Sequence, residues 1–394
     1  MSEEQRNDSP RALLNQSKIV FITNLCSHYT IKPFELIAKK YDTSFYFTGG
    51  HEAYWEKRNK VYLGNFRGEY LNGLRVGNHY KISWRLFSLF WTSWDFMIKT
   101  IDDRFALPLC FWAAKIRRKP FILWAGLWHS PQNRVHRIFS IVTKFIYQRS
   151  DAIVVYGTHV RDYLIKLGID KKKIFVAFHA MNNAQFNDCV SEDGKQTLRN
   201  ELGIKQKKVI LYVGRLEECK GLNYLAEALT KLPQKDFCML FIGCGSQKEQ
   251  LMARCDQGGF DYKFLDYVEN KKLLEYYAIA DIFVLPSITT KDFKEPWGLV
   301  INEAMNQGCP IIATDAVGAA AGGLVENGKN GFVVQERDSE VLKNAINKLI
   351  SDESLRLKMS SCSKERIKDW TQENMVRGFI DAVEYTQQKR FAKE

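Results

Sequence analysis

Two glutamates, Glu295 and Glu303, lie eight positions apart in the segment KEPWGLVINEAM, residues 294–305. The proline after Glu295 favours an extended backbone there, whereas Gly298 to Met305 is compatible with the first turns of a helix. One carboxylate is therefore expected in a loop at a helix mouth and the other within that helix. Because a helix mouth presents unpaired backbone N–H groups and a partial positive charge, it suits an anion. A nucleotide sugar, with its phosphates at one place and hydroxyls at two others, fits this layout.

Two cations follow an apolar run in VGRLEECKG, residues 213–221. The apolar run predicts a strand, so Arg215 and Lys220 are expected in the loop that leads to the next helix. A guanidinium and an ammonium at this position suit a diphosphate, although two solvated charges beside a strand would give the same pattern. The glycines of FIGCGSQ close the next predicted strand and would let a ligand approach the backbone.

Short apolar runs rich in Val, Ile and Phe alternate with longer helix-like stretches, which is typical of parallel sheets with crossover helices. These runs predict two doubly wound α/β domains with ligands at the carboxyl ends of the strands. The expected strands are 18–23, 44–48, 95–101, 121–126, 152–157 and 173–178 in the first half, and 209–214, 238–243, 263–268, 282–287, 310–315 and 331–334 in the second.

The domain boundaries follow from composition. Residues 1–185 are expected to form the first domain, and the polar stretch 186–207 a linker. Residues 208–370 are expected to form the second domain, and 371–394 a helix that crosses back to the first. At 394 residues with 45% hydrophobic content, the chain is long enough for two separate cores.

The cysteines and the amino terminus bear on the compartment. The nine cysteines are scattered without metal-binding or paired spacing, which favours a reducing environment and argues against a zinc site. The polar, acidic amino terminus is unlike a signal peptide, and no apolar run approaches the ~20 residues that a spanning helix requires. We expect a cytoplasmic protein that is either soluble or peripheral to the membrane.

The positive charge is concentrated in the first half. Residues 1–185 contain 28 Lys and Arg against 14 Asp and Glu, whereas the remainder contains 29 against 31. An anionic partner is implied for the first half: acidic phospholipid, a polyprenyl phosphate or nucleic acid. The basic run KIRRK at 115–119 is either a solvated helix end or a contact with lipid phosphates. Aromatic residues at 84, 87, 91 and 94 are placed on one helical face, which either belongs to the core or touches a membrane.

The motifs of the second half together resemble glycosyltransferase family 4, the retaining enzymes of the GT-B fold, in which two Rossmann-like domains face each other across a cleft. The resemblance rests on VGRLEECKG, FIGCG, PSITTKDFKEPWGLVINEAMNQGCPIIATDAVG and ENGKNGFVV, in this order. The first half resembles the family more loosely, through KPFILWAGLWHSP and SDAIVVYGTHVRDYLIKLGIDKKKIFV. The chain departs from the family in the longer connection ITTKDFK before Glu295.

The resemblance implies a role for each matched residue of the donor site. Glu303 would accept hydrogen bonds from the ribose hydroxyls, and Glu295 would hold hydroxyls of the donor sugar. The diphosphate would be held, and the leaving-group charge stabilised without a metal, by a third set of groups. These groups are Arg215, Lys220, the turn at Gly214, and the backbone of Gly298, Leu299 and Val300.

Residues of the first half are candidates for the acceptor side. His129 resembles the family histidine near the donor sugar and the bond that breaks, although a structural role in capping the loop before Pro131 is an alternative. In the loop after the first strand, Asn24, His28, Tyr29 and Thr30 are either acceptor contacts or ordinary helix-capping residues. The pair Asp102-Asp103 is interpreted as a helix start rather than as a metal site.

These observations favour a retaining hexosyltransferase that uses a UDP- or GDP-sugar, without a cofactor or metal, and acts on a lipid-linked or polysaccharide acceptor at the cytoplasmic membrane face. An epimerase on the same fold is the nearest alternative. A basic nucleic-acid-binding protein is a third, but no recognition module for nucleic acid is evident. A dehydrogenase is disfavoured because no GxGxxG follows the first strand. The sequence does not indicate an oligomeric state.

Overall fold

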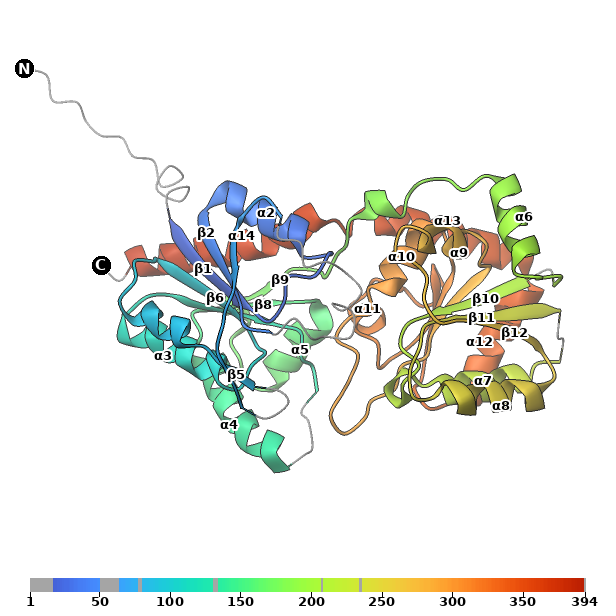
Figure 1. The fold of residues 1–394 in the computed structure, drawn as a ribbon, viewed down its shortest axis with the longest axis horizontal. Coiled ribbons are helices and arrows are strands. Elements are labelled where there is room, and N and C mark those ends of the chain that lie inside the picture. The colour runs from blue at the N-terminus through green and yellow to red at the C-terminus, as the bar shows by residue number, and fades with distance from the viewer. Residues whose placement is uncertain are drawn as a thin grey trace, which may run out of the picture.

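The structure is a computed structural model that describes residues 17–49, 64–76, 80–129, 134–206, 208–233 and 236–392. The chain forms two α/β domains at opposite ends of an elongated molecule (Figure 1). Among the described residues, no helix has both the length and the apolar character needed to cross a bilayer.

In the described part of the first domain, seven strands form a parallel sheet in the order β3-β2-β1-β6-β7-β8-β9. A small antiparallel ribbon of β4 (Leu74–Val76) and β5 (Tyr80–Ile82) stands apart from it. The strands of the large sheet are β1 (Lys18–Thr23), β2 (Asp42–Phe47), β3 (Arg67–Tyr70), β6 (Phe96–Thr100), β7 (Phe121–Ala125), β8 (Ala152–Val155) and β9 (Ile174–Val176).

Alternation along the strands divides the first core into two layers. Ile19 and Phe21 of β1 face one layer, whereas Val20 and Ile22 face the other, as the period of two in a strand requires. The first layer is covered by α2 (Ile31–Lys40) and α14 (Gln372–Phe391). The second is covered by η1 (Trp84–Phe90), α3 (Ala106–Ile116), α4 (Arg134–Arg149) and α5 (Thr158–Lys166).

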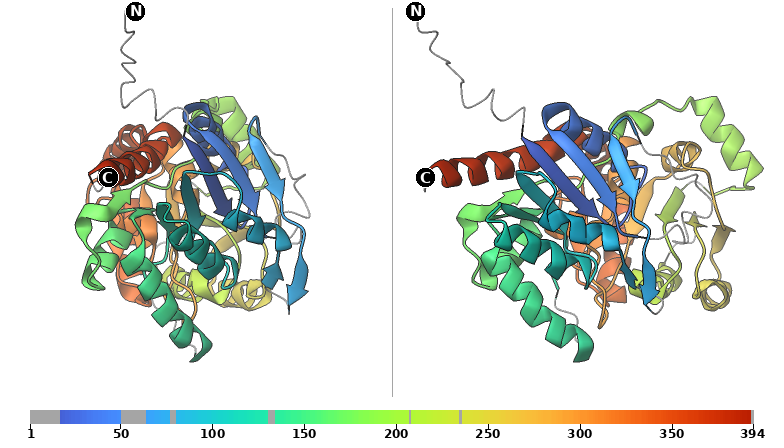
Figure 2. Two further views of the ribbon diagram at one scale, coloured as in Figure 1. Left: turned by 90° about the vertical axis from the view of Figure 1, so that its left-hand side faces the viewer. Right: turned by 60° about the vertical axis from the view of Figure 1, so that its left-hand side comes forward.

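The carboxy-terminal helix α14 packs on the first domain although it follows the second in sequence, as Figures 1 and 2 show. It buries Met375, Val376 and Phe379 among residues of the first sheet. A methyl group on its Gly378 would lie 2.6 Å from a carbonyl oxygen of β9, so this close approach requires glycine. The two domains are thus tied together by the end of the chain.

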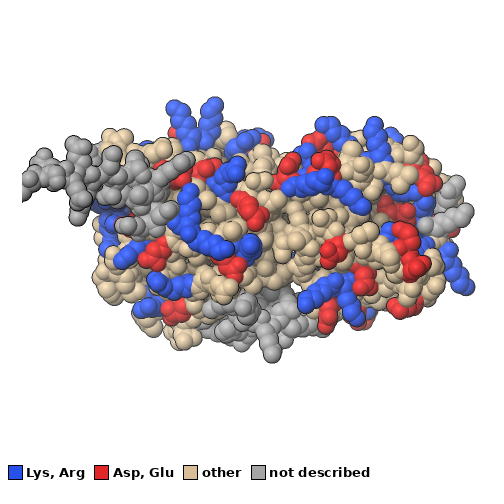
Figure 3. Space-filling view, turned by 90° about the horizontal axis from the view of Figure 1, so that it is seen from above, with Lys and Arg blue, Asp and Glu red and all other residues tan. Residues whose placement is uncertain are grey.

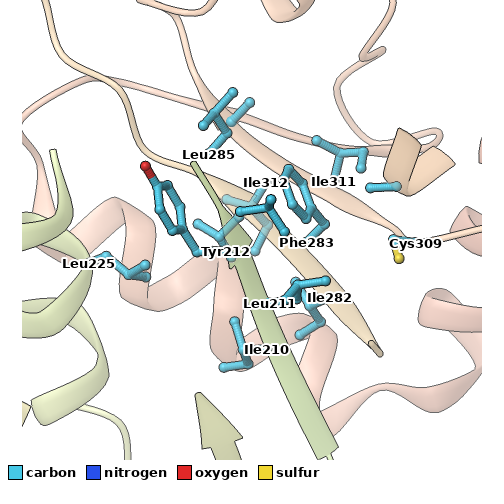
Figure 4. Close-up of a cluster of buried hydrophobic side chains, with 14 of the residues drawn as sticks. Ile210, Leu211, Tyr212, Leu225, Ile282, Phe283, Leu285, Cys309, Ile311 and Ile312 are labelled. Carbon is cyan, nitrogen blue, oxygen red and sulfur yellow. The ribbon is translucent and has the colours of Figure 1, made fainter. Parts of the chain in front are cut away.

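In the second domain, six described strands form a parallel sheet in the order β12-β11-β10-β13-β14-β15. Its core includes Tyr212, Leu225 and Phe283 (Figure 4). The strands are β10 (Lys208–Val213), β11 (Phe237–Ile242), β12 (Asp261–Leu265), β13 (Ile282–Leu285), β14 (Ile311–Thr314) and β15 (Gly331–Val334).

Helices cover both faces of the second sheet. One set contains α7 (Leu222–Thr230), α8 (Lys248–Gly258) and α12 (Ser339–Ser351); the other contains α9 (Leu273–Ala278), α10 (Val300–Asn306) and α13 (Glu353–Ile367). Two short helices, η4 (Glu218–Lys220) and α11 (Gly318–Ala321), follow β10 and β14, and α11 contacts α5 of the first domain. Residues 186–207, expected to be a linker, contain α6 (Glu192–Glu201), and Phe186 and Leu198 lie in the second core.

The predicted fold class is confirmed, and each expected strand overlaps an observed one. β3 and the ribbon of β4 and β5 were not predicted from the sequence. The expected aromatic helix face was wrong. Residues 84–90 form a 3₁₀ helix with about three residues per turn, so the aromatic spacing does not stay on one face. Trp84 and Trp91 are 70% and 71% exposed, whereas Trp94 lies beyond the helix and is 1% exposed.

Candidate active site

A buried ion pair lies at the carboxyl ends of two adjacent strands of the second sheet. Lys220 ends η4 after β10, and Glu295 belongs to the loop after β13, which pairs with β10 in parallel. The Lys220 ammonium pairs with the Glu295 carboxylate, and the hydroxyl of Ser287 donates to the same oxygen over 3.1 Å. Lys220 and Glu295 are 9% and 8% exposed. The fold therefore brings a cation and an anion 75 positions apart into direct contact.

Three glycines shape the backbone around this pair. Gly214 and Gly243 have φ of 153° and 141°, and a methyl group on Gly243 would lie 1.9 Å from the Gly214 carbonyl oxygen. The turns after β10 and β11 therefore pack backbone against backbone. Gly298 has φ of 94°, and a methyl group there would lie 2.8 Å from Leu285. Only glycine suits these positions because other residues are strained in this region and would clash.

The second glutamate is buried in α10. Glu303 accepts a hydrogen bond of 2.6 Å from the hydroxyl of Tyr277. Burial raises the pKa of Glu303 to about 7, while the Tyr277 hydrogen bond opposes this rise. The helix begins at Val300 after Leu299, so Glu303 lies in its first turn as the segment 298–305 indicated.

Arg215 differs from Lys220 in its surroundings. Its side chain is exposed, and its carbonyl oxygen accepts a 2.6 Å hydrogen bond from the Tyr212 hydroxyl. The guanidinium thus remains in contact with solvent near the turn at Gly214. Of the two cations expected in one loop, Arg215 is exposed and Lys220 is buried.

The first domain contacts the Glu295 loop through the segment that contains His129. Trp128, after β7, donates from its indole nitrogen to the carbonyl oxygen of Glu295 over 2.9 Å. The ammonium of Lys294 lies 3.8 Å from the centre of the Trp128 ring. The Nε2 atom of the neighbouring His129 is buried and has no hydrogen-bond partner among the described residues. His129 therefore lies on a loop that touches the Glu295 peptide.

The four acceptor candidates lie after β1, and several of their polar groups have local partners. The Asn24 side chain accepts from the Leu25 amide over 2.8 Å, and the Thr30 hydroxyl donates to the Ser27 carbonyl over 2.9 Å. The first contact orders the chain directly after β1, and the second stabilises the turn before α2.

Of the other two candidates, His28 contacts the second domain and Tyr29 contacts the crossing helix α14. His28 Nε2 lies 3.0 Å from the side-chain amide of Asn270, and burial lowers the pKa of His28. The carbonyl of Tyr29 accepts a 2.8 Å hydrogen bond from Gln372 of α14. This loop thus contacts both the second domain and the crossing helix.

The aspartate pair has structural partners. Asp103 accepts from the amides of Phe105 and Ala106 over 2.9 and 3.0 Å, which matches the expected helix start. Asp102 forms an ion pair with the buried Lys99 and accepts from the Asn24 amide over 2.9 Å.

Sequence reasoning missed four residues that contact this site: Ser287, Tyr277, Trp128 and His159. Ser287 is the last residue of a predicted strand, at the edge where ligands were expected, which was a usable signal. His159 is the second residue of α5, and its Nε2 lies 3.0 Å from the carbonyl oxygen of Pro296. A contact between a ring nitrogen and a distant carbonyl leaves no local pattern in the sequence.

The second half of the chain matches a known protein family. Residues 194–366 match the family model described as glycosyl transferases group 1. A D-inositol 3-phosphate glycosyltransferase of Corynebacterium jeikeium is 33% identical over 184 residues, or 43% of this chain and 42% of that protein. An uncharacterised glycosyltransferase of Methanocaldococcus jannaschii is 28% identical over 238 residues, or 59% of this chain and 58% of that protein. The second half of the chain is therefore similar to the group 1 glycosyltransferases.

The alignments span about half the length of these curated relatives, but the likeness to solved structures extends over both domains. The crystal structure of Anabaena HepE in complex with UDP-glucose matches with a TM-score of 0.72 at 19% identity. It covers 93% of this chain and 99% of that one. At this identity the likeness concerns the fold alone, and it agrees with a GT-B architecture of two Rossmann-like domains.

Proposed function

We propose that this protein is a retaining, metal-independent hexosyltransferase that uses a nucleotide diphosphate sugar and acts on a lipid-linked or polysaccharide acceptor at the cytoplasmic membrane face. The observation that carries this proposal is the buried pair of Lys220 and Glu295. It lies where ligands bind in doubly wound sheets, and within the segment that matches the group 1 family.

Lys220 serves the diphosphate and Glu295 the sugar in this proposal. An ammonium has three N–H donors, so Lys220 can contact a phosphate oxygen and still hold Glu295. The exposed Arg215 and the backbone N–H groups of Gly298, Leu299 and Val300 complete the diphosphate site. They stabilise the negative charge that grows on the leaving diphosphate.

Retention follows from attack on the face that the leaving group occupies. The bond between the anomeric carbon and the diphosphate oxygen breaks, and its electron pair stays on the phosphate. The acceptor oxygen bonds to the same face of the anomeric carbon, and its proton passes to the departing phosphate oxygen. His129, whose Nε2 lacks a partner in the described chain, holds a sugar hydroxyl or orients the acceptor.

A uridine donor is favoured over a guanosine donor. The HepE structures were determined with UDP and with UDP-glucose, which supports the same nucleotide here. A capsular polysaccharide biosynthesis glycosyltransferase of Staphylococcus aureus is 27% identical over 210 residues, covering 52% of each chain. Its name supports a polysaccharide or its lipid-linked precursor as the acceptor.

The membrane proposal rests on α3, α4 and the chain around them. Residues 104–150 contain nine Lys and Arg and no Asp or Glu. Trp112 and Ile116 of α3 are exposed, as are Ile141 and Phe145 of α4. The rings of Trp112 and Phe145 lie 6.3 Å apart, so the two helices expose one apolar surface. In contrast, Figure 3 shows a face on which basic and acidic side chains are interspersed.

The KIRRK run contributes less to this surface than its sequence indicates. Arg117 donates to the carbonyl oxygens of Leu89 and Thr92, and Lys119 pairs with Asp95 over 3.2 Å. Arg118 is exposed. We therefore assign the lipid contacts mainly to Arg118, Lys144 and Arg149 around the apolar surface.

The purified protein should release UDP from one or more uridine diphosphate sugars in the presence of acceptor lipids or oligosaccharides. UDP release is measured across uridine and guanosine diphosphate sugars, and NMR of the product reports the anomeric configuration. An α-linked product from an α-linked donor supports the proposal. Recovery of an epimerised nucleotide sugar, or binding of nucleic acid with no binding of UDP, would contradict it.

A further inference from the structure

Two successive carbonyl groups of the Glu295 loop accept hydrogen bonds from the first domain. Trp128 donates to the carbonyl of Glu295 over 2.9 Å, and His159 lies 3.0 Å from the carbonyl of Pro296. A carbonyl oxygen only accepts, so the hydrogen of His159 must be on Nε2. Both donors come from the carboxyl end of the first sheet, Trp128 after β7 and His159 after β8.

The imidazole of His159 fits between the domains because glycines surround it. A methyl group on Gly157, from the first domain, would lie 2.8 Å from Nδ1. On the second domain, methyl groups on Gly318 and Gly322 would lie 2.9 Å from Nε2 and 2.8 Å from Nδ1. The ring is also 4.9 Å from Trp128, centre to centre. The contact is thus a close-packed seam between the two domains.

Within this seam His159 is neutral. Burial lowers its pKa to about 4, and Nδ1 has no hydrogen-bond partner among the described residues. A buried nitrogen without a partner carries a free-energy cost, so the imidazole needs a compensating contact at this position. The compensating contact is the one that Nε2 makes with Pro296.

The same loop is fixed from the second domain as well. The Glu295 carbonyl also accepts from the Gly318 amide over 3.1 Å, and the Trp297 carbonyl accepts from the Ala319 amide over 2.7 Å. The Pro296 carbonyl, between these two, is bonded from the first domain by His159. The backbone on either side of the Glu295 carboxylate is therefore held jointly by both domains.

We propose that Trp128 and His159 are positioning residues that set the orientation of Glu295 when the first domain is docked on the second. The carboxylate of Glu295 then faces the donor sugar only while both carbonyls are held. Through this contact, the domain that binds the acceptor controls the residue that holds the donor sugar. The catalytic consequence rests on the proposed role of Glu295; the seam itself does not.

The seam is tested first without any substrate. His159→Leu and Trp128→Phe each remove one hydrogen-bond donor and leave an apolar side chain to fill the space. Thr158→Val is the matched control, since the Thr158 hydroxyl also crosses the seam, to the Gly322 carbonyl over 3.2 Å, but does not touch the Glu295 loop. Hydrogen exchange of the Gly318 and Ala319 amides should accelerate about fivefold or more in the two variants and not in the control. Unchanged exchange in both variants would overturn the proposal.

Turnover then separates positioning from simple stability. In His159→Leu, the rate of UDP release should fall about tenfold, which is the loss expected for one hydrogen bond. The Kd for UDP should stay within about twofold of the wild-type value. His159→Gln, whose side-chain amide can donate to the same carbonyl, should restore most of the activity. Equal losses in the Gln and Leu variants would overturn the positioning role.

Two further results keep the outcomes distinct. Gly322→Ala keeps both donors but puts a methyl group 2.8 Å from His159 Nδ1, so it should also accelerate exchange, whereas Gly194→Ala on α6 should not. If the wild type turns over no nucleotide sugar while exchange responds as expected, the proposed function fails and the seam stands. If turnover is normal and exchange is unchanged in all variants, the proposed function stands and the seam fails.

Discussion

The two domains share a doubly wound parallel topology but differ in what surrounds the carboxyl ends of their strands. In the second domain, Lys220 and Glu295 are buried, and Gly214 and Gly243 bring two turns into backbone contact. In the first domain, the loop after β1 bonds mainly to itself, to α14 and to Asn270 of the second domain. The second domain thus has a buried, closely packed ion pair at its strand ends, whereas the loop of the first domain makes mainly polar contacts with neighbouring segments.

Their outer surfaces differ as well. The first domain carries the charge excess and the acid-free stretch 104–150, with exposed apolar side chains on α3 and α4. The second half is nearly balanced in charge. Under the proposed function, this contrast matches a donor site of buried charges in the second domain and an anionic partner that contacts a broad surface of the first. Each prediction below changes one side of this contrast.

The largest effect is expected for Glu295→Gln. The substitution keeps the size of the side chain but removes the negative charge, so turnover should fall by about 100-fold, or about 2.7 kcal/mol of barrier. Affinity for UDP should not weaken, because Lys220 remains available to the diphosphate. UDP-release kinetics and calorimetric titration measure the two quantities. A folded variant with normal turnover would show that Glu295 does not hold the sugar.

Lys220→Ala should affect nucleotide binding rather than turnover alone. The Kd for UDP should rise roughly 30-fold, as expected for a lost charge-assisted contact, while the Kd for uridine changes little because uridine has no phosphate. Lys231→Ala is the control, since Lys231 forms surface ion pairs with Glu227 and Glu340. Equal losses for UDP and uridine would remove Lys220 from the diphosphate site.

The strands of the two sheets could be predicted from the sequence because each buried strand is a short local run of apolar residues. The sequence also placed Lys220 and Glu295 in loops and Glu303 in the first turns of a helix, which agrees with their positions in the structure. It did not predict that Lys220 pairs with Glu295, because the pairing depends on how two loops fold back over neighbouring strands. It placed Arg215 beside Lys220 without indicating that one is exposed and the other buried.

The contacts between the two domains could not be predicted from the sequence. Trp128 and His159 bind backbone carbonyls, which every residue has, so neither the residue types nor the spacing point to a partner. The aromatic residues at 84–94 were misplaced for a different reason. The helical spacing assumed an α-helix, whereas the chain forms a short 3₁₀ helix and leaves it before the buried Trp94.

Binding to anionic vesicles should depend on the first domain alone. Trp112→Ser with Phe145→Ser removes apolar contact, and binding should fall about tenfold through lost burial of aromatic area. Leu357→Ser, at an exposed leucine of the second domain, is the control. Flotation with vesicles of phosphatidylglycerol and phosphatidylcholine measures the bound fraction. Equal binding to purely neutral vesicles, or no response to salt, would contradict an electrostatic contact.

The smallest effect on ligand binding is expected from the protonation of Glu303, which also changes stability. Burial raises its pKa from 4.5 to about 7, so between these values the folded chain holds a proton that the unfolded chain has lost. The stability from this group is therefore full below about pH 4.5 and is lost as the pH rises through 7. From pH 5.5 to 8.5 the wild type should lose about 2 kcal/mol more than Glu303→Gln.

Binding of UDP should show the opposite trend, because the carboxylate accepts both ribose hydroxyls better than the neutral acid does. Affinity should rise about threefold from pH 6 to 8 in the wild type, relative to Glu303→Gln. The phosphates of UDP titrate equally with both proteins, so the difference between the two curves isolates Glu303. Parallel curves for both affinity and thermal unfolding would show that Glu303 stays in one charge state over this pH range. They would contradict a ribose contact that depends on the ionisation of Glu303.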